Sequence, residues 1–118
     1  MKGFIISVCI IAVVLCLVIA NSLITLNITE RLINKIDLLS SDSHILMKEI
    51  QEIWEKSSFF IGLSSSTKET DKVTDMLSSI DAMYNSNDFF GLEEKKALLI
   101  NYIRLIKSHE KVNLENIL

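Results

Sequence analysis

The hydrophobic positions divide the chain into one continuous apolar run and a longer amphipathic part. Residues 4–20 contain no charged side chain and a single hydroxyl group, that of Ser7, and hydrophobicity returns at Leu23 and Ile24. A helix of about 21 residues is roughly 31 Å long, close to the hydrocarbon thickness of a bilayer, about 30 Å. The pattern therefore predicts a transmembrane helix in residues 1–24, with the lipid bilayer as a partner.

After this run, apolar residues recur with the spacing of a heptad repeat. The stripe steps by four and three residues through Leu32, Ile36, Leu39, Ser43, Leu46, Ile50, Ile53, Ser57 and Phe60. Neither proline nor glycine interrupts residues 4–60. The span and the stripe are therefore predicted to form one long helix, with a soft joint at residues 21–27.

The stripe has two interpretations. Leu39, Leu46, Ile50 and Ile53, together with Trp54, are either an interaction seam for a partner helix or part of the core of the chain's own domain. The second interpretation is favoured, because the later helices need an apolar surface to cover.

Two shorter helices are expected after a serine-rich loop at residues 64–67. Ser66 and Glu69 fit a capping box, which opens a helix that ends at residues 85–88. The next helix begins near Leu92, with Phe89 and Phe90 packed against the bundle and residues 112–118 as a tail that folds back. The two helices carry apolar faces: Val73, Met76, Leu77, Ile80, Met83 and Tyr84 on the first, and Leu92, Leu99, Ile103 and Ile106 on the second.

The predicted fold is therefore all-α, with an N-terminal transmembrane helix that continues into a small antiparallel bundle of about three helices. The predicted division is a signal anchor at residues 1–24 and a helical extracytoplasmic domain at residues 25–118. The absence of proline and the presence of only three glycines support this helical interpretation. A net charge of −3 argues against nucleic acid as a partner, because nucleic-acid binding requires a basic patch.

Three interpretations compete for the N-terminal segment. An uncleaved anchor is favoured, because the apolar run is longer than the core of a secretory signal peptide, although cleavage after Ala20 remains an alternative. The start at Lys2 and Gly3 also resembles a type IV pilin, but Val8 stands where that family has a glutamate. Basic residues on the two sides of the span nearly balance, and the short leader favours an extracytoplasmic C-terminal part.

The sequence contains no pattern typical of an active site. The two histidines, His44 and His109, have no ligand partner at metal-binding spacing, and three scattered glycines cannot form a phosphate-binding loop. Cys9 and Cys16 lie within the apolar run and are expected to be small apolar residues of the span. We therefore expect no catalytic activity, no metal and no cofactor.

The sequence Trp54-Glu55-Lys56 and the ending Leu114-Glu115-Asn116-Ile117-Leu118 resemble an uncharacterised family of short single-span membrane proteins from clostridia and related spore-forming bacteria. The resemblance extends over nearly the whole chain. It implies a membrane location and a helical fold, and it implies no activity. The family pattern has a histidine before the second soluble helix, whereas this chain has Ser66-Thr67-Lys68-Glu69-Thr70-Asp71 there, so no role for that histidine is carried over.

These observations predict a membrane-anchored helical module that binds another membrane or envelope protein, with homo-oligomerisation possible. The alternative is an extracytoplasmic domain that senses a small molecule or serves as an accessory part of a membrane complex.

Overall fold

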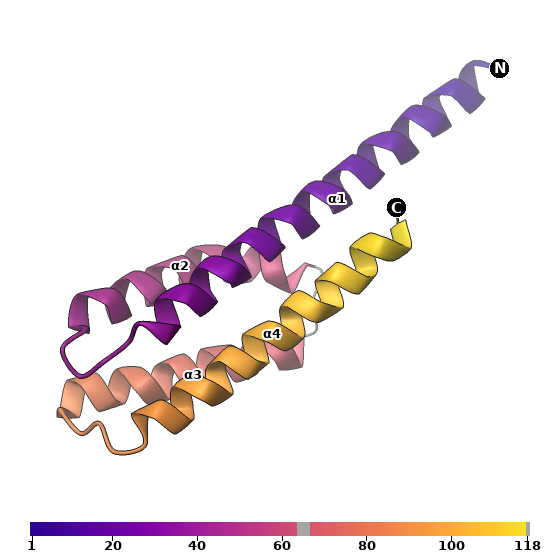
Figure 1. Ribbon diagram of the computed structural model, residues 1–118. Coiled ribbons are helices and arrows are strands. Elements are labelled where there is room, and N and C mark those ends of the chain that lie inside the picture. Colours follow the sequence, from indigo (N-terminus) through magenta and orange to yellow (C-terminus); the bar gives the residue numbers. More distant parts are fainter. Residues whose placement is uncertain (64–66, 118) are drawn as a thin grey trace.

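The computed structural model describes residues 1–63 and 67–117, which form four helices and no strand. The helices are α1 (Lys2–Asp37), α2 (His44–Gly62), α3 (Thr67–Ser86) and α4 (Leu92–Ile117) (Figure 1). The all-α prediction is confirmed, but the bundle has about four helices, whereas about three were expected. The capping box predicted at Ser66 lies outside the described residues.

The additional helix arises because the expected long helix is interrupted after Asp37. A turn at residues 38–43 reverses the chain, so Leu39 lies in the turn and Leu46 lies in the first turn of a separate antiparallel helix. The Oγ of Ser43 accepts a hydrogen bond from the backbone N–H of Ser40 (3.2 Å), and the two hydroxyl oxygens lie 3.0 Å apart. Short polar side chains of this kind compete with the helix for backbone hydrogen bonds, so the run Ser40-Ser41-Asp42-Ser43 favours a turn.

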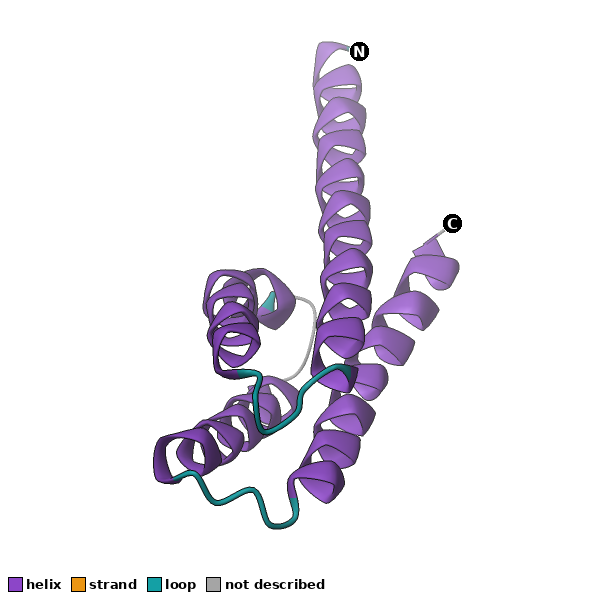
Figure 2. Cartoon of the chain, turned by 60° about the vertical axis from the view of Figure 1, so that its left-hand side comes forward, coloured by secondary structure: helices purple, strands orange, loops and turns teal. Residues whose placement is uncertain are grey.

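The four helices run alternately up and down, and α4 closes the bundle against α1. α1 packs against α2 and α4, and α3 packs against the same two helices. The N-terminal half of α1 projects beyond the bundle, which gives the molecule dimensions of 67 × 21 × 21 Å (Figure 2). The C-terminal ends of α2 and α4 lie on the side of the projecting segment. The turns at residues 38–43 and 87–91 lie at the opposite end of the bundle, which is called the distal end below (Figure 1).

α1 crosses residue 24 without a break, and its packing against the bundle begins at Ser22. Its buried residues are Ser22, Thr25, Thr29, Leu32 and Ile36, which share one face of the helix at heptad spacing. The core then includes Met47, Ile50, Trp54 and Ile61 from α2, Val73, Leu77, Ile80, Met83 and Tyr84 from α3, and Leu92, Leu99, Ile100, Ile103 and Ile106 from α4. The apolar faces predicted for the two later helices therefore lie mostly inside the bundle.

The connection between α3 and α4 agrees with the sequence in part. Asn87 adopts a left-handed conformation (φ 54°), and the N–H of Asp88 bonds the carbonyl of Met83 at 3.1 Å, a common way to end a helix. The predicted end at residues 85–88 and the start at Leu92 are confirmed. Two expectations are wrong: residues 112–117 continue α4, and Phe90 is exposed, although Phe89 is half-buried.

Candidate functional site

The five residues of the predicted interaction seam lie along the inner side of the bundle. Leu39, Ile50 and Trp54 are buried, and Leu46 and Ile53 are half-buried against the same core. The indole N–H of Trp54 also donates a hydrogen bond to Thr74 Oγ1 on α3 (2.9 Å). Helices of the same chain therefore cover most of this stripe.

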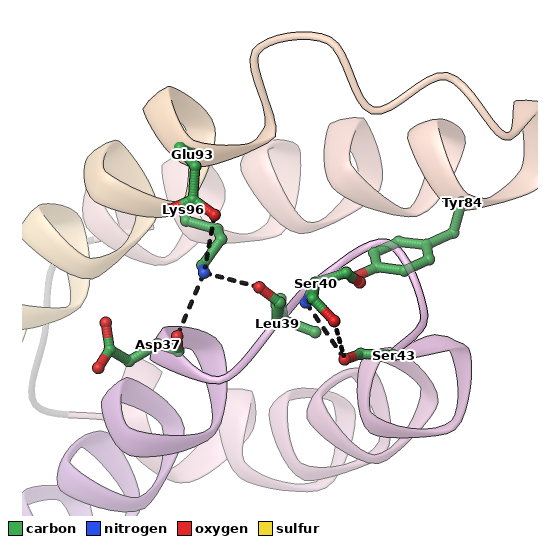
Figure 3. A network of polar contacts seen from close by, with 7 residues as sticks. All are labelled: Asp37, Leu39, Ser40, Ser43, Tyr84, Glu93 and Lys96. Atoms are coloured by element: carbon green, nitrogen blue, oxygen red, sulfur yellow. Dashed lines mark hydrogen bonds and ion pairs between the residues drawn. The ribbon is translucent and has the colours of Figure 1, made fainter.

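At the distal end, a buried lysine holds the turn after α1. The ammonium group of Lys96 on α4 donates hydrogen bonds to the carbonyl oxygens of Leu39 (2.7 Å) and Asp37 (3.2 Å) and lies 3.3 Å from the carboxylate of Glu93 (Figure 3). The last carbonyls of a helix have no partner within the helix, and a cation at this position stabilises them. Lys96 therefore fixes the end of α1 to the start of α4.

A second residue from another helix holds the same turn. The hydroxyl of Tyr84 on α3 donates a 2.6 Å hydrogen bond to the carbonyl of Ser40 (Figure 3). Burial of this side chain raises the pKa of its hydroxyl above the ordinary value of 10.0. The Tyr84 ring packs edge-to-face against His44 and Phe89, with centroid distances of 5.0 and 5.1 Å. The turn is therefore held by side chains from both α3 and α4.

The distal end exposes three large apolar side chains. Phe90 is 93% exposed, and Ile45 and Leu38 are 79% and 69% exposed. They come from three separate segments that meet at this end of the bundle (Figure 1). A cavity of about 380 Å³, lined by residues 40–41 and 89–94, lies between the two distal loops. Exposed apolar surface at one end of a molecule is a candidate protein-binding site.

The other end of the bundle has a larger cavity, of about 560 Å³, between α1 and α4. Its polar lining is contributed by Asn21 and Ser22 on α1 and by Glu110, Asn113 and Asn116 on α4. Its apolar lining is Leu17, Val18, Leu63 and Ile117. Figure 2 shows the two helices diverging toward their ends here. The cavity therefore lies where the bundle meets the projecting segment.

Glu110 is the most deeply buried charged residue of this region. It is 1% exposed, and its Oε1 accepts a hydrogen bond from the hydroxyl of Ser22 at 2.5 Å. Its Oε2 has no hydrogen-bond partner among the described residues, and neither has the buried hydroxyl of Thr25, one turn further along α1. A buried polar atom without a partner costs roughly 1–3 kcal/mol, so this arrangement requires an explanation.

The two histidines have different surroundings. His109 Nδ1 lies 2.5 Å from the carboxylate of Glu69, and the His109 side chain is exposed. His44 packs against aromatic rings at the start of α2. In the part of the chain that the structure describes, no group of three or more His, Cys, Asp or Glu residues is placed to hold a metal ion. The expectation that the chain has no catalytic activity stays a prediction.

Lys96 and Glu110 did not emerge from the sequence as important residues. Both continue the stripe of α4: the buried positions 92, 96, 99, 103, 106 and 110 step by four and three. Continuing the heptad spacing along α4, whatever the residue type at each position, would therefore have located both residues. The same extension of α1 backwards from Leu32 reaches Thr29, Thr25 and Ser22.

Comparisons with protein-family models, with curated proteins and with solved structures find no match to this chain. The resemblance to a family of clostridial membrane proteins therefore stays a prediction.

Proposed function

We propose that this chain is a membrane-anchored helical module that presents its distal end to another protein of the membrane or envelope. The observation that carries the proposal is the exposure of Phe90, Ile45 and Leu38 at the distal end, where Lys96 and Tyr84 hold the turn at residues 38–43. A loop that is already held in its bound conformation loses less entropy on binding than a mobile loop, which favours association.

Membrane insertion of α1 is the second part of the proposal. α1 is long and apolar enough to cross a membrane, and none of the residues in its most apolar window is buried in the bundle. An exposed apolar surface of this length is stabilised by lipid and destabilised by water. Carbonate washing of membranes should therefore leave the protein in the pellet, and release into the supernatant would contradict insertion.

An extracytoplasmic location of the bundle is the third part. A reporter enzyme that is active only outside the cytoplasm, fused after residue 118, should be active. Activity of a cytoplasm-specific reporter at the same site would reverse the orientation. Sequencing of the N-terminus of the mature protein would distinguish an uncleaved anchor from a signal peptide cleaved after Ala20.

The partner is tested with a photo-crosslinking amino acid in place of Phe90. We expect a discrete crosslinked product in cells. In a second chain, the crosslinking amino acid replaces Leu38, and we expect the additional substitution Phe90→Ser to lower the yield of the crosslinked product. Phe59 is the matched control, because it is also exposed (69%) but lies near the opposite end of the bundle. Equal crosslinking from positions 90 and 59 would show that the distal end has no special role.

A small-molecule-binding accessory domain is a second candidate function, and the 560 Å³ cavity at Glu110 supports it. Apolar cavities with a few convergent polar groups are the usual form of ligand sites. A ligand-dependent rise in melting temperature that persists in Phe90→Ser would favour this function over protein binding.

A further inference from the structure

The cavity between α1 and α4 has polar and apolar lining residues from both helices. Leu17 and Val18 precede Ser22 by about one helical turn, and Ile117 follows Glu110 by about two turns, roughly 10 Å. Because α1 and α4 are antiparallel, both displacements point toward the projecting segment of α1 (Figure 1). Ser22 and Glu110 therefore lie toward the bundle, and Leu17, Val18 and Ile117 lie nearer the span. Asn113 and Asn116 lie between Glu110 and Ile117 along α4.

This order matches the orientation of a membrane lipid beside the span. If α1 is inserted, Leu17 and Val18 adjoin the hydrocarbon region, and Ser22 and Glu110 lie at headgroup depth. A lipid of the leaflet nearest the bundle would then direct its headgroup toward Glu110 and its acyl chains along the exposed apolar surface of α1. The inference thus rests on the proposed membrane insertion and deepens the second candidate function.

The unpaired Oε2 of Glu110 specifies the charge of the ligand. A buried carboxylate oxygen is stabilised by a cationic hydrogen-bond donor, and no described lysine, arginine or histidine forms an ion pair with Glu110. A primary ammonium group carries one positive charge and three N–H donors. The side chains of Asn113 and Asn116 add amide oxygens that accept hydrogen bonds and amide groups that donate them to a phosphate.

We propose that this cavity binds a phospholipid with a primary ammonium headgroup, such as an ethanolamine phospholipid. The ammonium group donates to Oε2 of Glu110, and the amides of Asn113 and Asn116 contact the phosphate. Because Oε2 is buried, binding includes a rotation of the Glu110 side chain toward the cavity that it lines. A choline headgroup has the same charge but no N–H donor, so it cannot satisfy Oε2. Selectivity for a primary over a quaternary ammonium group is therefore the distinguishing property of the site.

The test is lipid competition on the full-length chain. The purified protein is equilibrated in detergent micelles with equal amounts of ethanolamine, choline and glycerol phospholipids of identical acyl chains, and the bound lipid is identified by native mass spectrometry. We expect the ethanolamine lipid to be enriched about fivefold or more over the choline lipid, as a charge-assisted hydrogen bond implies. Equal retention of the two lipids, or retention of neither, would overturn the proposal.

Glu110→Gln should abolish the enrichment, because the amide carries no charge to pair with the ammonium group. Glu115→Gln is the matched control, since Glu115 is exposed on the same helix and lines a different cavity. Enrichment that persists in Glu110→Gln would overturn the assignment. If Glu110→Gln fails to fold, Asn116→Leu decides instead, because its side chain is exposed and the bundle should fold. Since Asn116 contacts the phosphate, which all three lipids carry, this variant should retain less of every lipid, and unchanged retention would overturn the proposal.

Carbonate extraction separates this outcome from failure of the underlying function. Protein that resists extraction but shows no lipid preference would contradict the lipid site alone. Protein that is extracted would contradict membrane insertion, and with it the basis of the site.

Discussion

The ammonium nitrogen of Lys96 lies 2.7 Å from the carbonyl oxygen of Leu39, 57 positions earlier in the chain. This bond joins the turn after α1 to the helix that closes the bundle. A charged group is buried here because the last carbonyls of α1 supply its acceptors. The contact therefore gives buried carbonyl groups at the end of α1 a hydrogen-bond donor, so this helix end can pack inside the bundle.

Replacing Lys96 by Met tests this relationship, because methionine keeps an unbranched apolar stem and removes the ammonium group. We expect the free energy of unfolding to fall by about 1.5–3 kcal/mol, the usual range for hydrogen bonds to a charged group. The measurement is a denaturant titration of the full-length chain in detergent micelles, followed by the fluorescence of Trp54. Lys48→Met, on the exposed surface of α2, should change stability by less than about 0.5 kcal/mol, and equal losses in the two variants would contradict the role of Lys96.

Tyr84→Phe removes the second bond that holds the turn. At neutral pH we expect a loss of about 1 kcal/mol, because the carbonyl of Ser40 loses its hydroxyl donor. Tyr102→Phe is the control, because Tyr102 is half-buried and the structure gives no hydrogen bond from its hydroxyl to a described backbone carbonyl. A loss in Tyr102→Phe as large as that in Tyr84→Phe would argue against a specific contribution of the bond to Ser40.

The same tyrosine should make stability depend on pH in the alkaline range. Because burial raises the pKa of Tyr84, the unfolded chain releases this proton first as the pH rises. The contribution of Tyr84 to stability is therefore complete below pH 10.0 and is lost as the pH rises through the raised pKa. Melting curves from about pH 9 to about pH 11 should fall less steeply for Tyr84→Phe than for the wild type; parallel curves would show that Tyr84 titrates normally.

The heptad spacing of apolar residues predicted much of the core, but it did not predict the chain reversal at residues 38–43. The stripe from Leu32 to Phe60 keeps its spacing across residues 38–43, so the pattern alone is compatible with either one helix or two. The outcome depends on the polar run Ser40–Ser43, whose side chains bond each other and the backbone, and on Lys96 and Tyr84, which contact the turn from distant positions. Single-sequence patterns carry no information on such distant contacts.

The two ends of the bundle were predicted less well than its core. Phe89 and Phe90 have the same side chain, yet one is half-buried and the other exposed, because the backbone turns sharply between Asn87 and Gly91. Glu110 was not considered because carboxylates are rarely buried. Its burial follows from the antiparallel packing of α4 beside Ser22, which the sequence separates by 88 positions.

Gly91 provides a test of the distal loop that involves the backbone alone. Its φ is +79°, and a Cβ atom there would meet no atom within 4 Å, so Gly91→Ala should cost about 1 kcal/mol through backbone strain without a clash. Gly62→Ala, in the helix α2, also meets no atom within 4 Å and should be neutral or slightly stabilising. Thermal melts of both variants measure the difference, and a stability loss at position 62 equal to that at position 91 would contradict the strain argument.

The last prediction concerns what the stripe of α2 faces, since an open seam and a closed core imply different modes of association. Ile45, Leu46 and Ile50 differ in burial: Ile45 is 79% exposed, Leu46 is half-buried and Ile50 is 0% exposed. If the bundle covers the stripe, Ile50→Ala should lower the free energy of unfolding by about 2–5 kcal/mol, and Ile45→Ala should change it by less than about 0.5 kcal/mol. Leu46→Ala should lie between the two.

An open seam would give the opposite result. The three variants would then melt like the wild type, and sedimentation would show loss of self-association or of a bound partner in Leu46→Ala and Ile50→Ala. Measuring melting and sedimentation on the same samples distinguishes the two cases, because a residue of the monomer core changes the melting temperature at every protein concentration. An Ile50→Ala variant that melts like the wild type at low protein concentration, and below it only at high concentration, would indicate that association, and not the bundle itself, covers this side chain.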